Sequence, residues 1–398
     1  MRDFSKENLT PDGDRRSAPT ISPDLDADLL WQHLEESCRW ERPVNPSGAG
    51  AALGYTGSEL DSYGIAVTTH EADVYVPSKN EWRRLLFPVA NVVPDGGSAL
   101  SVLVGGHGDA SLLELARLFH LHRNELSHGV RFAWWNGGGE IGFSSAAWYA
   151  DHHFDLLQSR CLAYLNVDHL ADCSQTGYQP YATAELVDWV KDAVKRLAGQ
   201  EAEPTPLPRN ADGSLLGVGR PSFSFLPVSQ ARGLGMMDRE RLVERTGLYA
   251  EALYELCTSA RAPIDLMAIA DVFWGELEVL SQAVGDAFDL GHVKEGVKEL
   301  VVVLEDREEI DAQLEPGEAN RKMLDVCRLL NPILYTESGP YEHDTGGNRG
   351  VLPGLRRALG LSQLDPDGPE RRLLGARLVR ERNRVSDMMS RAILVARG

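Results

Sequence analysis

The sequence has no excess of basic residues: among its 398 residues, 40 Lys and Arg stand against 59 Asp and Glu, which gives a net charge of −19. A nucleic-acid-binding surface needs a basic face, so this balance argues against a nucleic-acid partner. No run reaches the roughly eighteen apolar residues that a membrane-spanning helix requires. The first residues, MRDFSKENLTPDGDRRSAPT, lack the apolar stretch of a signal peptide. We therefore expect a cytoplasmic protein with no membrane partner.

Cysteine is scarce and follows no metal-binding or redox pattern. The five cysteines are widely spaced, and no CxxC pair occurs among them. An odd, scattered set argues against a disulfide framework and for a reducing compartment. Motifs for other chemistries are also missing. GVGRP at 217–221 lacks the spacing of a dinucleotide fingerprint, no Walker motif occurs, and GFSSA around Ser145 lacks the second glycine of a serine-hydrolase nucleophile elbow.

The apolar pattern divides the chain into three parts. Residues 1–21 are polar and charged, and we expect a disordered tail there. A helix is predicted to open at SPDLDADLLW, with Ser22 as its N-cap and Pro23 as its first residue. Strands then alternate with helices over 22–261, which predicts a three-layer α/β sandwich with a mostly parallel central sheet. Residues 262–398 are helical in period throughout and predict a C-terminal α-helical bundle domain.

Polar side chains follow three of the predicted strands at the point where each strand ends. His107 and Asp109 follow VLVGG, Glu140 follows RFAWWNGGG, and Asp168 and His169 follow LAYLNV. Ligands of open α/β sheets bind at the carboxyl ends of the strands, so these residues are expected at one edge. Imidazole and carboxylate groups together are typical of zinc sites, where the metal makes a hydroxide near neutral pH. Asp and His are also common at strand ends as ordinary loop residues.

Five segments carry a resemblance to a known family by their order and spacing. VLVGGHGD, LLELARLF, GVRFAWWNGGGEIGFSSAAWYA, LAYLNVD and RNADGSLLGVGRPSF resemble, in that order, the zinc aminopeptidase and glutamate carboxypeptidase–transferrin receptor family. The similarity covers most of residues 24–360. It implies the fold of the di-zinc exopeptidases. The C-terminal helices resemble the family's dimerisation domain, which implies a homodimer. No protease-associated domain fits between residues 77 and 98.

The resemblance also implies which residues form the site. Family members hold two zinc ions with a His, a bridging Asp, a Glu, an Asp and a final His, and a second Glu acts as general base. His107 matches the first His and Asp109 the carboxylate that orients it. Glu140 matches the Glu ligand, and Asp168 the Asp ligand. The implied metal ligands are therefore His107, Glu140 and Asp168, and the implied catalytic groups are Asp109 and Glu140.

Three departures from the family pattern change the expected chemistry. The loop that carries the bridging Asp is missing between Asp109 and Leu112, and Gly139 occupies the general-base position. No His occurs in QARGLGMMDRERLVE, where the last ligand belongs. We therefore expect one zinc per chain or none, since catalytic zinc normally has three protein ligands. His169 is a possible substitute ligand. The expected substrate-pocket residues are Arg209, Asp212, Ser214, Tyr341 and His343.

These observations leave three functions open. The first is a metal-dependent hydrolase that uses a rebuilt, mononuclear site on a small peptide-like or amide substrate. The second is a non-catalytic scaffold of the transferrin-receptor type, which loss of the base and of two ligands would suit. The third is a metal-free biosynthetic enzyme that reuses the old pocket, an analogy at the level of the fold alone.

Overall fold

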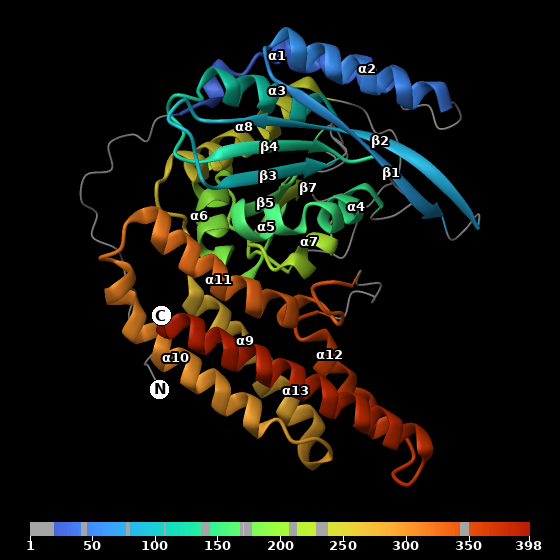
Figure 1. The fold of residues 1–398 in the computed structure, drawn as a ribbon, viewed down its shortest axis with the longest axis vertical. Coiled ribbons are helices and arrows are strands. Elements are labelled where there is room, and N and C mark those ends of the chain that lie inside the picture. The colour runs from blue at the N-terminus through green and yellow to red at the C-terminus, as the bar shows by residue number, and fades with distance from the viewer. Residues whose placement is uncertain are drawn as a thin grey trace.

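A mixed sheet lies at the centre of the α/β region, with strand order β1-β2-β4-β3-β5-β7-β6 (Figure 1). The four central strands β4, β3, β5 and β7 pair in parallel, and β1, β2 and β6 add antiparallel pairs at the two sides. The predicted α/β fold is confirmed, with its parallel part in these four strands. The strands are β1 (Val67–Val76), β2 (Glu81–Val92), β3 (Ser101–Gly106), β4 (Gly129–Trp134), β5 (Cys161–Asn166), β6 (Tyr178–Ala182) and β7 (Ser222–Pro227).

The computed structural model describes most of the chain, with several internal gaps. The described residues are 20–40, 46–76, 80–106, 109–136, 144–167, 170, 177–206, 213–227, 238–342 and 350–398. The tail predicted at 1–21 therefore lies outside them, apart from its last two residues. The expected absence of an inserted domain between 77 and 98 agrees with β2, which occupies most of that segment.

Helices cover both faces of the sheet and form the outer two layers (Figure 1). One face packs against α1 (Ala27–Trp40), α2 (Pro46–Ser62), α3 (Asp109–Leu121), α6 (Val187–Ala198) and α8 (Arg239–Thr258). The other face packs against α4 (Ser144–His152), α5 (Phe154–Arg160) and α7 (Gly213–Val218). Strand β3 shows why both faces are apolar. Val102 and Val104 enter the first core and Leu103 enters the second, because successive side chains of a strand point to opposite faces.

Two local features differ from the sequence-based expectation. Ser22 does not cap α1, because it begins a short 3-10 turn, η1 (Ser22–Asp24). The cap is Asp26, whose Oδ1 accepts the backbone N–H groups of Asp28 at 3.0 Å and Leu29 at 2.9 Å. Asp26 takes this role because it directly precedes the first helical turn, where the free N–H groups lie. The edge strand β6 was not predicted either, and its central proline is tolerated because it lies at the edge of the sheet.

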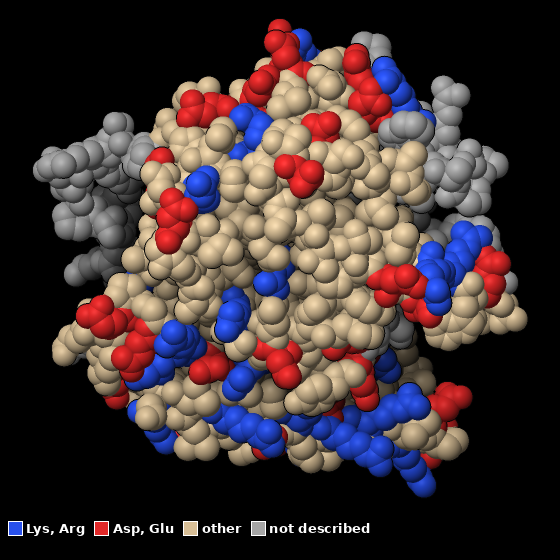
Figure 2. Space-filling model, turned by 45° about the horizontal axis from the view of Figure 1, so that its top comes forward, with Lys and Arg blue, Asp and Glu red and all other residues tan. Residues whose placement is uncertain are grey.

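The C-terminal region consists of helices around a separate apolar core. Its helices are α9 (Leu266–Val284), α10 (Gly291–Asp311), α11 (Pro316–Tyr335), α12 (Pro353–Arg356) and α13 (Pro369–Arg397), with 3-10 turns η3 (Gly285–Ala287) and η4 (Arg357–Gln363). Figure 2 shows Lys and Arg gathered over these helices in the lower part of the view. None of the described helices is long and apolar enough to cross a membrane.

Buried polar contacts join the α/β region to the C-terminal helices. Helix α11 packs against α7, and α9 packs against the 3-10 turn η2 (Ala184–Leu186). The Asn331 amide on α11 donates to Glu185 Oε1 at 2.7 Å, and the backbone N–H of Ala184 donates to the Tyr335 hydroxyl at 2.8 Å. Helix α11 is thereby fixed against the edge of the α/β region.

Candidate active site

The carboxyl ends of β4, β3 and β5 lie side by side. Gly106 at the end of β3 is level with Trp134 of β4, and Gly105 is level with Asn166 of β5. The contacts continue one residue further, since the Trp135 N–H donates to the Gly106 carbonyl at 3.0 Å and the Val167 N–H to the Gly105 carbonyl at 2.9 Å. The chain therefore leaves three neighbouring strands at one edge.

The predicted metal ligands come directly after these strand ends. His107 follows Gly106, Asp168 follows Val167, and Glu140 lies in the segment 137–143 that follows β4. All three lie outside the described residues, as does His169. Their assignment therefore stays a prediction, which the neighbouring strand ends support.

The Trp135 indole packs against the end of β3 at this edge. Trp135 is buried against Gly105, where a Cβ would overlap the indole Nε1 and two ring carbons. The Trp135 Nε1–H donates to the Tyr164 hydroxyl at 3.2 Å, and that hydroxyl donates to the Gly105 carbonyl at 3.5 Å. Glycine is therefore required at 105, because any side chain there would displace the indole that packs against the end of β3. Sequence reasoning missed this contact, although the Trp-Trp pair at the end of a strand was a visible signal.

The segment that carries Glu140 is fixed at both ends by one side chain. The buried Ser145 hydroxyl accepts the Asn136 N–H at 3.0 Å and donates to the Asn136 carbonyl at 2.8 Å. The Asn136 amide donates in turn to the carbonyl of Leu86 on β2 at 3.2 Å. The Ser145 hydroxyl is thus used for structure, which agrees with the expectation that it is no hydrolytic nucleophile.

Helix α3 begins at Asp109, two residues beyond His107. No loop therefore separates the His-x-Asp pair from the helix, as the sequence indicated. The Asp109 side chain lies outside the described part, so its predicted orienting role is untested. The early start of α3 removes the place from which a bridging carboxylate would come.

The remaining predicted pocket residues are mostly outside the described residues. This holds for Arg209, Asp212 and His343, and also for the side chain of Ser214, whose backbone lies in α7. Tyr341 is described and 82% exposed, and its ring lies 5.4 Å from that of Phe154 on α5. In Figure 1 the described ends of the loop between α11 and α12 lie on the side toward which the β3 and β4 arrows point.

An aromatic wall that was not predicted flanks the same edge. Phe87 lies 5.9 Å from Trp135 and stacks on His70 of β1 at 5.3 Å between ring centroids. His70 lies 5.0 Å from His153, and burial lowers the pKa of both imidazoles. These imidazoles belong to an apolar cluster, and no three described His, Cys, Asp or Glu side chains are grouped to hold a metal.

Comparison with known proteins identifies the segment that contains these strand ends. Residues 105–214 match peptidase family M28. This M28 segment runs from Gly105 to the start of α7 and contains the three predicted metal ligands. The resemblance to the zinc aminopeptidases is thereby confirmed. No curated protein sequence matches the chain.

Solved structures share the fold at low sequence identity. An aminopeptidase from Aneurinibacillus sp. strain AM-1 matches with a TM-score of 0.50 and 14% identity, covering 60% of this chain and 95% of that one. A Zn-dependent exopeptidase from Parabacteroides distasonis has a TM-score of 0.47 and 15% identity over 59% and 99% of the two chains. A Bacteroides thetaiotaomicron glutaminyl cyclase, bound to N-acetylhistamine, has a TM-score of 0.48 and 13% identity over 59% and 98%.

The donor set of the predicted site fits zinc by its chemistry. One imidazole and two carboxylates are the kind and number of ligands that catalytic zinc takes, with a fourth position left for water. Val167, which directly precedes Asp168, donates its N–H to the carbonyl of Gly105, and Gly105 lies two residues before His107. His107, Glu140 and Asp168 are therefore the residues that could hold a metal at this edge.

Proposed function

We propose that this protein is a metal-dependent amide hydrolase with a mononuclear zinc site formed by His107, Glu140 and Asp168. The observation that carries the proposal is the adjacency of the β4, β3 and β5 carboxyl ends within the M28 segment. The substrate class is a small peptide-like or amide molecule. Zinc, when bound, supplies a Lewis acid and lowers the pKa of a water molecule.

The chain's own residues shape and position this site. The Ser145–Asn136 contacts join the two residues that flank the segment carrying Glu140. The buried Trp135 indole packs against Gly105 at the end of β3 and fills the space there. His70 and Phe87 stack beside Trp135 and make this flank of the edge apolar.

Metal content tests the proposal directly. The purified chain, equilibrated with zinc and desalted, should retain about one zinc per chain by elemental analysis. His107→Ala and Asp168→Asn should each lose most of it, because removing one of three ligands leaves too few for a catalytic site. His292→Ala is the matched control, since His292 is exposed at the start of α10, and it should retain the metal. Wild-type protein that binds no zinc would overturn the proposal.

A non-catalytic scaffold is the second candidate function. It is favoured by the start of α3 at Asp109, which leaves no loop for a bridging carboxylate, and by Gly139 at the position of the family's general base. Turnover separates the two. A zinc-loaded hydrolase should cleave aminoacyl p-nitroanilides or other small amides, and Glu140→Gln should abolish that cleavage. Retained zinc without turnover of any amide would favour the scaffold.

A further inference from the structure

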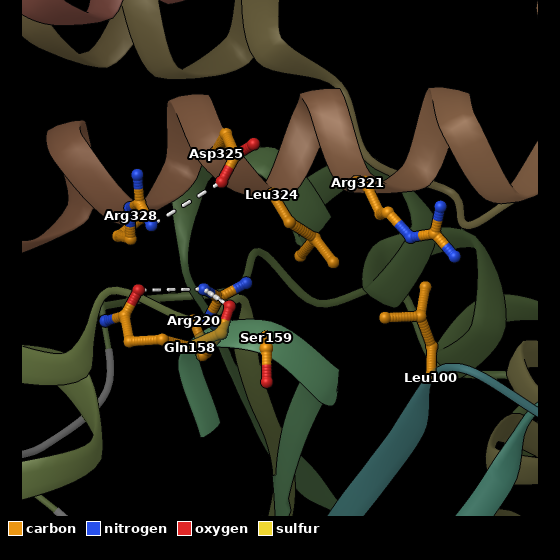
Figure 3. A pocket seen from close by; sticks show the side chains of 8 residues that line it. All are labelled: Leu100, Gln158, Ser159, Arg220, Arg321, Leu324, Asp325 and Arg328. Carbon is orange, nitrogen blue, oxygen red and sulfur yellow. Dashed lines mark hydrogen bonds and ion pairs between the residues drawn. The ribbon is translucent and has the colours of Figure 1, made fainter. Parts of the chain in front are cut away.

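A groove of 390 Å³ lies at the opposite edge of the sheet from the candidate active site (Figure 3). Its walls are α11 and the residues that precede the central strands. Leu100 comes directly before β3, Ser159 lies just before β5, and Arg220 lies two residues before β7. The groove therefore opens at the amino ends of the strands, and no predicted site residue lines it.

Arg220 is a buried cation that makes no ion pair with a carboxylate among the described residues. Its side chain is 2% exposed, and its Nη2 donates to the Gln158 carbonyl at 2.5 Å and to Gln158 Oε1 at 3.0 Å. Both acceptors are neutral, and the buried Nε has no hydrogen-bond partner among the described residues. Burial lowers the pKa of the guanidinium. An anion bound beside Arg220 would relieve an uncompensated buried charge.

Helix α11 adds two more guanidinium groups to the same groove. Arg321 and Arg328 are seven residues apart, two helical turns, so they project from one face of the helix about 10 Å apart. Arg328 makes a long, half-exposed pair with Asp325 at 3.7 Å. Arg321 is exposed and has no ion pair or hydrogen bond within the described part of the chain. The groove therefore holds three guanidinium groups and one carboxylate, Asp325, so it is locally positive although the whole protein has a net charge of −19.

The groove is rigid because the backbone of α11 lies on the turn before β7. Gly219 has φ +80°, and a Cβ there would lie 2.8 Å from the Arg328 carbonyl oxygen and 2.9 Å from its Cα. The turn that presents Arg220 is therefore held directly against the helix that presents Arg321 and Arg328. The backbone segments that carry the three guanidinium groups are thus held together before an anion binds, which lowers the cost of binding.

Apolar surface lies next to these charges. Leu324 lies between Arg220 and Arg321 in the groove, and Leu100 lies opposite Arg321 (Figure 3). Beyond Arg321 the groove continues into a second hollow of 260 Å³, which shares Leu100 and Arg321 with the first. There is thus room for an organic substituent beside a charged group.

We propose that this groove is a second ligand site, which takes a small phosphate monoester with an apolar substituent. The phosphate lies between Arg220 and Arg328, with Arg321 at the rim, and the substituent lies against Leu100 and Leu324. Three guanidinium groups and one carboxylate leave two positive charges, which a phosphate monoester, with close to two negative charges at neutral pH, balances. The guanidinium fork also matches phosphate oxygens in geometry.

Calorimetric titration of the whole protein with phenyl phosphate tests the site. Arg321→Gln and Arg328→Gln should each weaken binding about tenfold, and the double variant about a hundredfold, because each removes a charge-assisted hydrogen bond. Lys322→Gln removes the same charge from the same helix. Lys322 pairs with Glu318 and does not line the groove, so this control should bind like wild type. Wild-type affinity in the double variant, shown folded by circular dichroism, would overturn the proposal.

Two further titrations fix the chemistry and the location. Benzoate, with one negative charge, should bind at least tenfold more weakly than phenyl phosphate, and equal affinity would contradict a phosphate site. His107→Ala should leave phenyl phosphate binding unchanged, because His107 follows the other end of β3. Loss of binding in His107→Ala would place the phosphate at the candidate active site and overturn the second site. These outcomes do not depend on whether the protein hydrolyses amides.

Discussion

The Ser145 hydroxyl binds both backbone polar groups of Asn136, accepting its N–H at 3.0 Å and donating to its carbonyl at 2.8 Å. One side chain on α4 thereby fixes the two ends of the segment that carries Glu140. A serine that the sequence could only exclude as a nucleophile has a positioning role at the candidate active site.

Ser145→Ala should therefore destabilise the fold and weaken metal binding together. It leaves two backbone groups of Asn136 without this partner, and an unsatisfied buried polar group costs about 1–3 kcal/mol. Urea unfolding and zinc titration measure the two effects. Ser390→Ala is the matched control, because the exposed Ser390 hydroxyl donates only to a carbonyl of its own helix. Unchanged zinc affinity in Ser145→Ala would contradict the positioning role.

Gly105→Ala should destabilise the protein by about 1–3 kcal/mol, the usual cost of overpacking a core. The new methyl group would overlap the Trp135 indole beneath the strand ends. In the double variant with Trp135→Phe, the smaller ring should reduce the cost of the alanine, which a double-mutant cycle of unfolding free energies would show. Gly54→Ala, at an exposed helical position with no atom within 4 Å of the Cβ, should be neutral or stabilising.

The protein should lose stability as the pH falls below about 6.5, in part because of His33. This imidazole is buried between the hydroxyls of Tyr55 at 2.7 Å and Tyr63 at 2.9 Å, and burial lowers its pKa to about 4. Between about pH 6.5 and pH 4, the imidazole of His33 is protonated in the unfolded chain and neutral in the folded protein. The free energy of unfolding therefore falls by up to about 1.4 kcal/mol per pH unit.

Urea unfolding of wild type and His33→Gln at about pH 7.5 and pH 5 measures this contribution. The variant should lose less stability than wild type between the two pH values, although it is less stable at the higher one. An identical loss in both proteins would show that His33 does not titrate in this range.

Glu185 should have the opposite pH dependence. It is buried where α11 meets the α/β region, and its Oε1 accepts the Thr183 hydroxyl at 2.9 Å and the Asn331 amide at 2.7 Å. Burial raises the pKa of this carboxyl. The folded protein then holds a proton that the unfolded chain releases above its own pKa of about 4.3, so this contribution to stability is lost as the pH rises toward the folded pKa.

Glu185→Gln keeps an acceptor oxygen and removes the ionisation. It should be at least as stable as wild type at about pH 8 and should vary less with pH, as unfolding in urea would show. Glu185→Ala, which removes the acceptor of both hydrogen bonds, should be destabilised by about 1–3 kcal/mol at either pH. Greater destabilisation of Glu185→Gln at pH 8 than at pH 5 would contradict a raised pKa.

The homodimer implied by the family resemblance should form through residues 262–398. Apolar side chains are exposed on two neighbouring helices of this region, Val302 on α10 at 57% and Leu394 on α13 at 66%. Val302→Glu and Leu394→Glu together should give a monomer by light scattering, because a dimer interface cannot bury unpaired charges cheaply. Trp82→Glu, at an exposed site on β2, should not change the mass.

Sequence alone was sufficient for the features that depend on local patterns. Alternating strand and helix periods predicted the α/β sandwich, because apolar residues must recur on the buried face of each element. The order and spacing of the segments from VLVGGHGD to RNADGSLLGVGRPSF predicted the relationship to the zinc aminopeptidases, which the M28 match to residues 105–214 confirms. The early start of α3 followed from the short spacing of Asp109 and Leu112, which only Ala110 and Ser111 separate.

Only the tertiary structure could decide which distant residues meet. Strand register and helix packing, which no local pattern encodes, bring together three pairs of residues at the candidate active site. These pairs are Ser145 with Asn136, Trp135 with Gly105, and His70 with His153. The groove of Arg220, Arg321 and Arg328 is the strongest case, because it combines a turn before β7 with a helix about a hundred residues later. Nothing in the sequence indicates that these three arginines are neighbours. They form a site because Gly219 allows α11 to lie directly against the turn that carries Arg220.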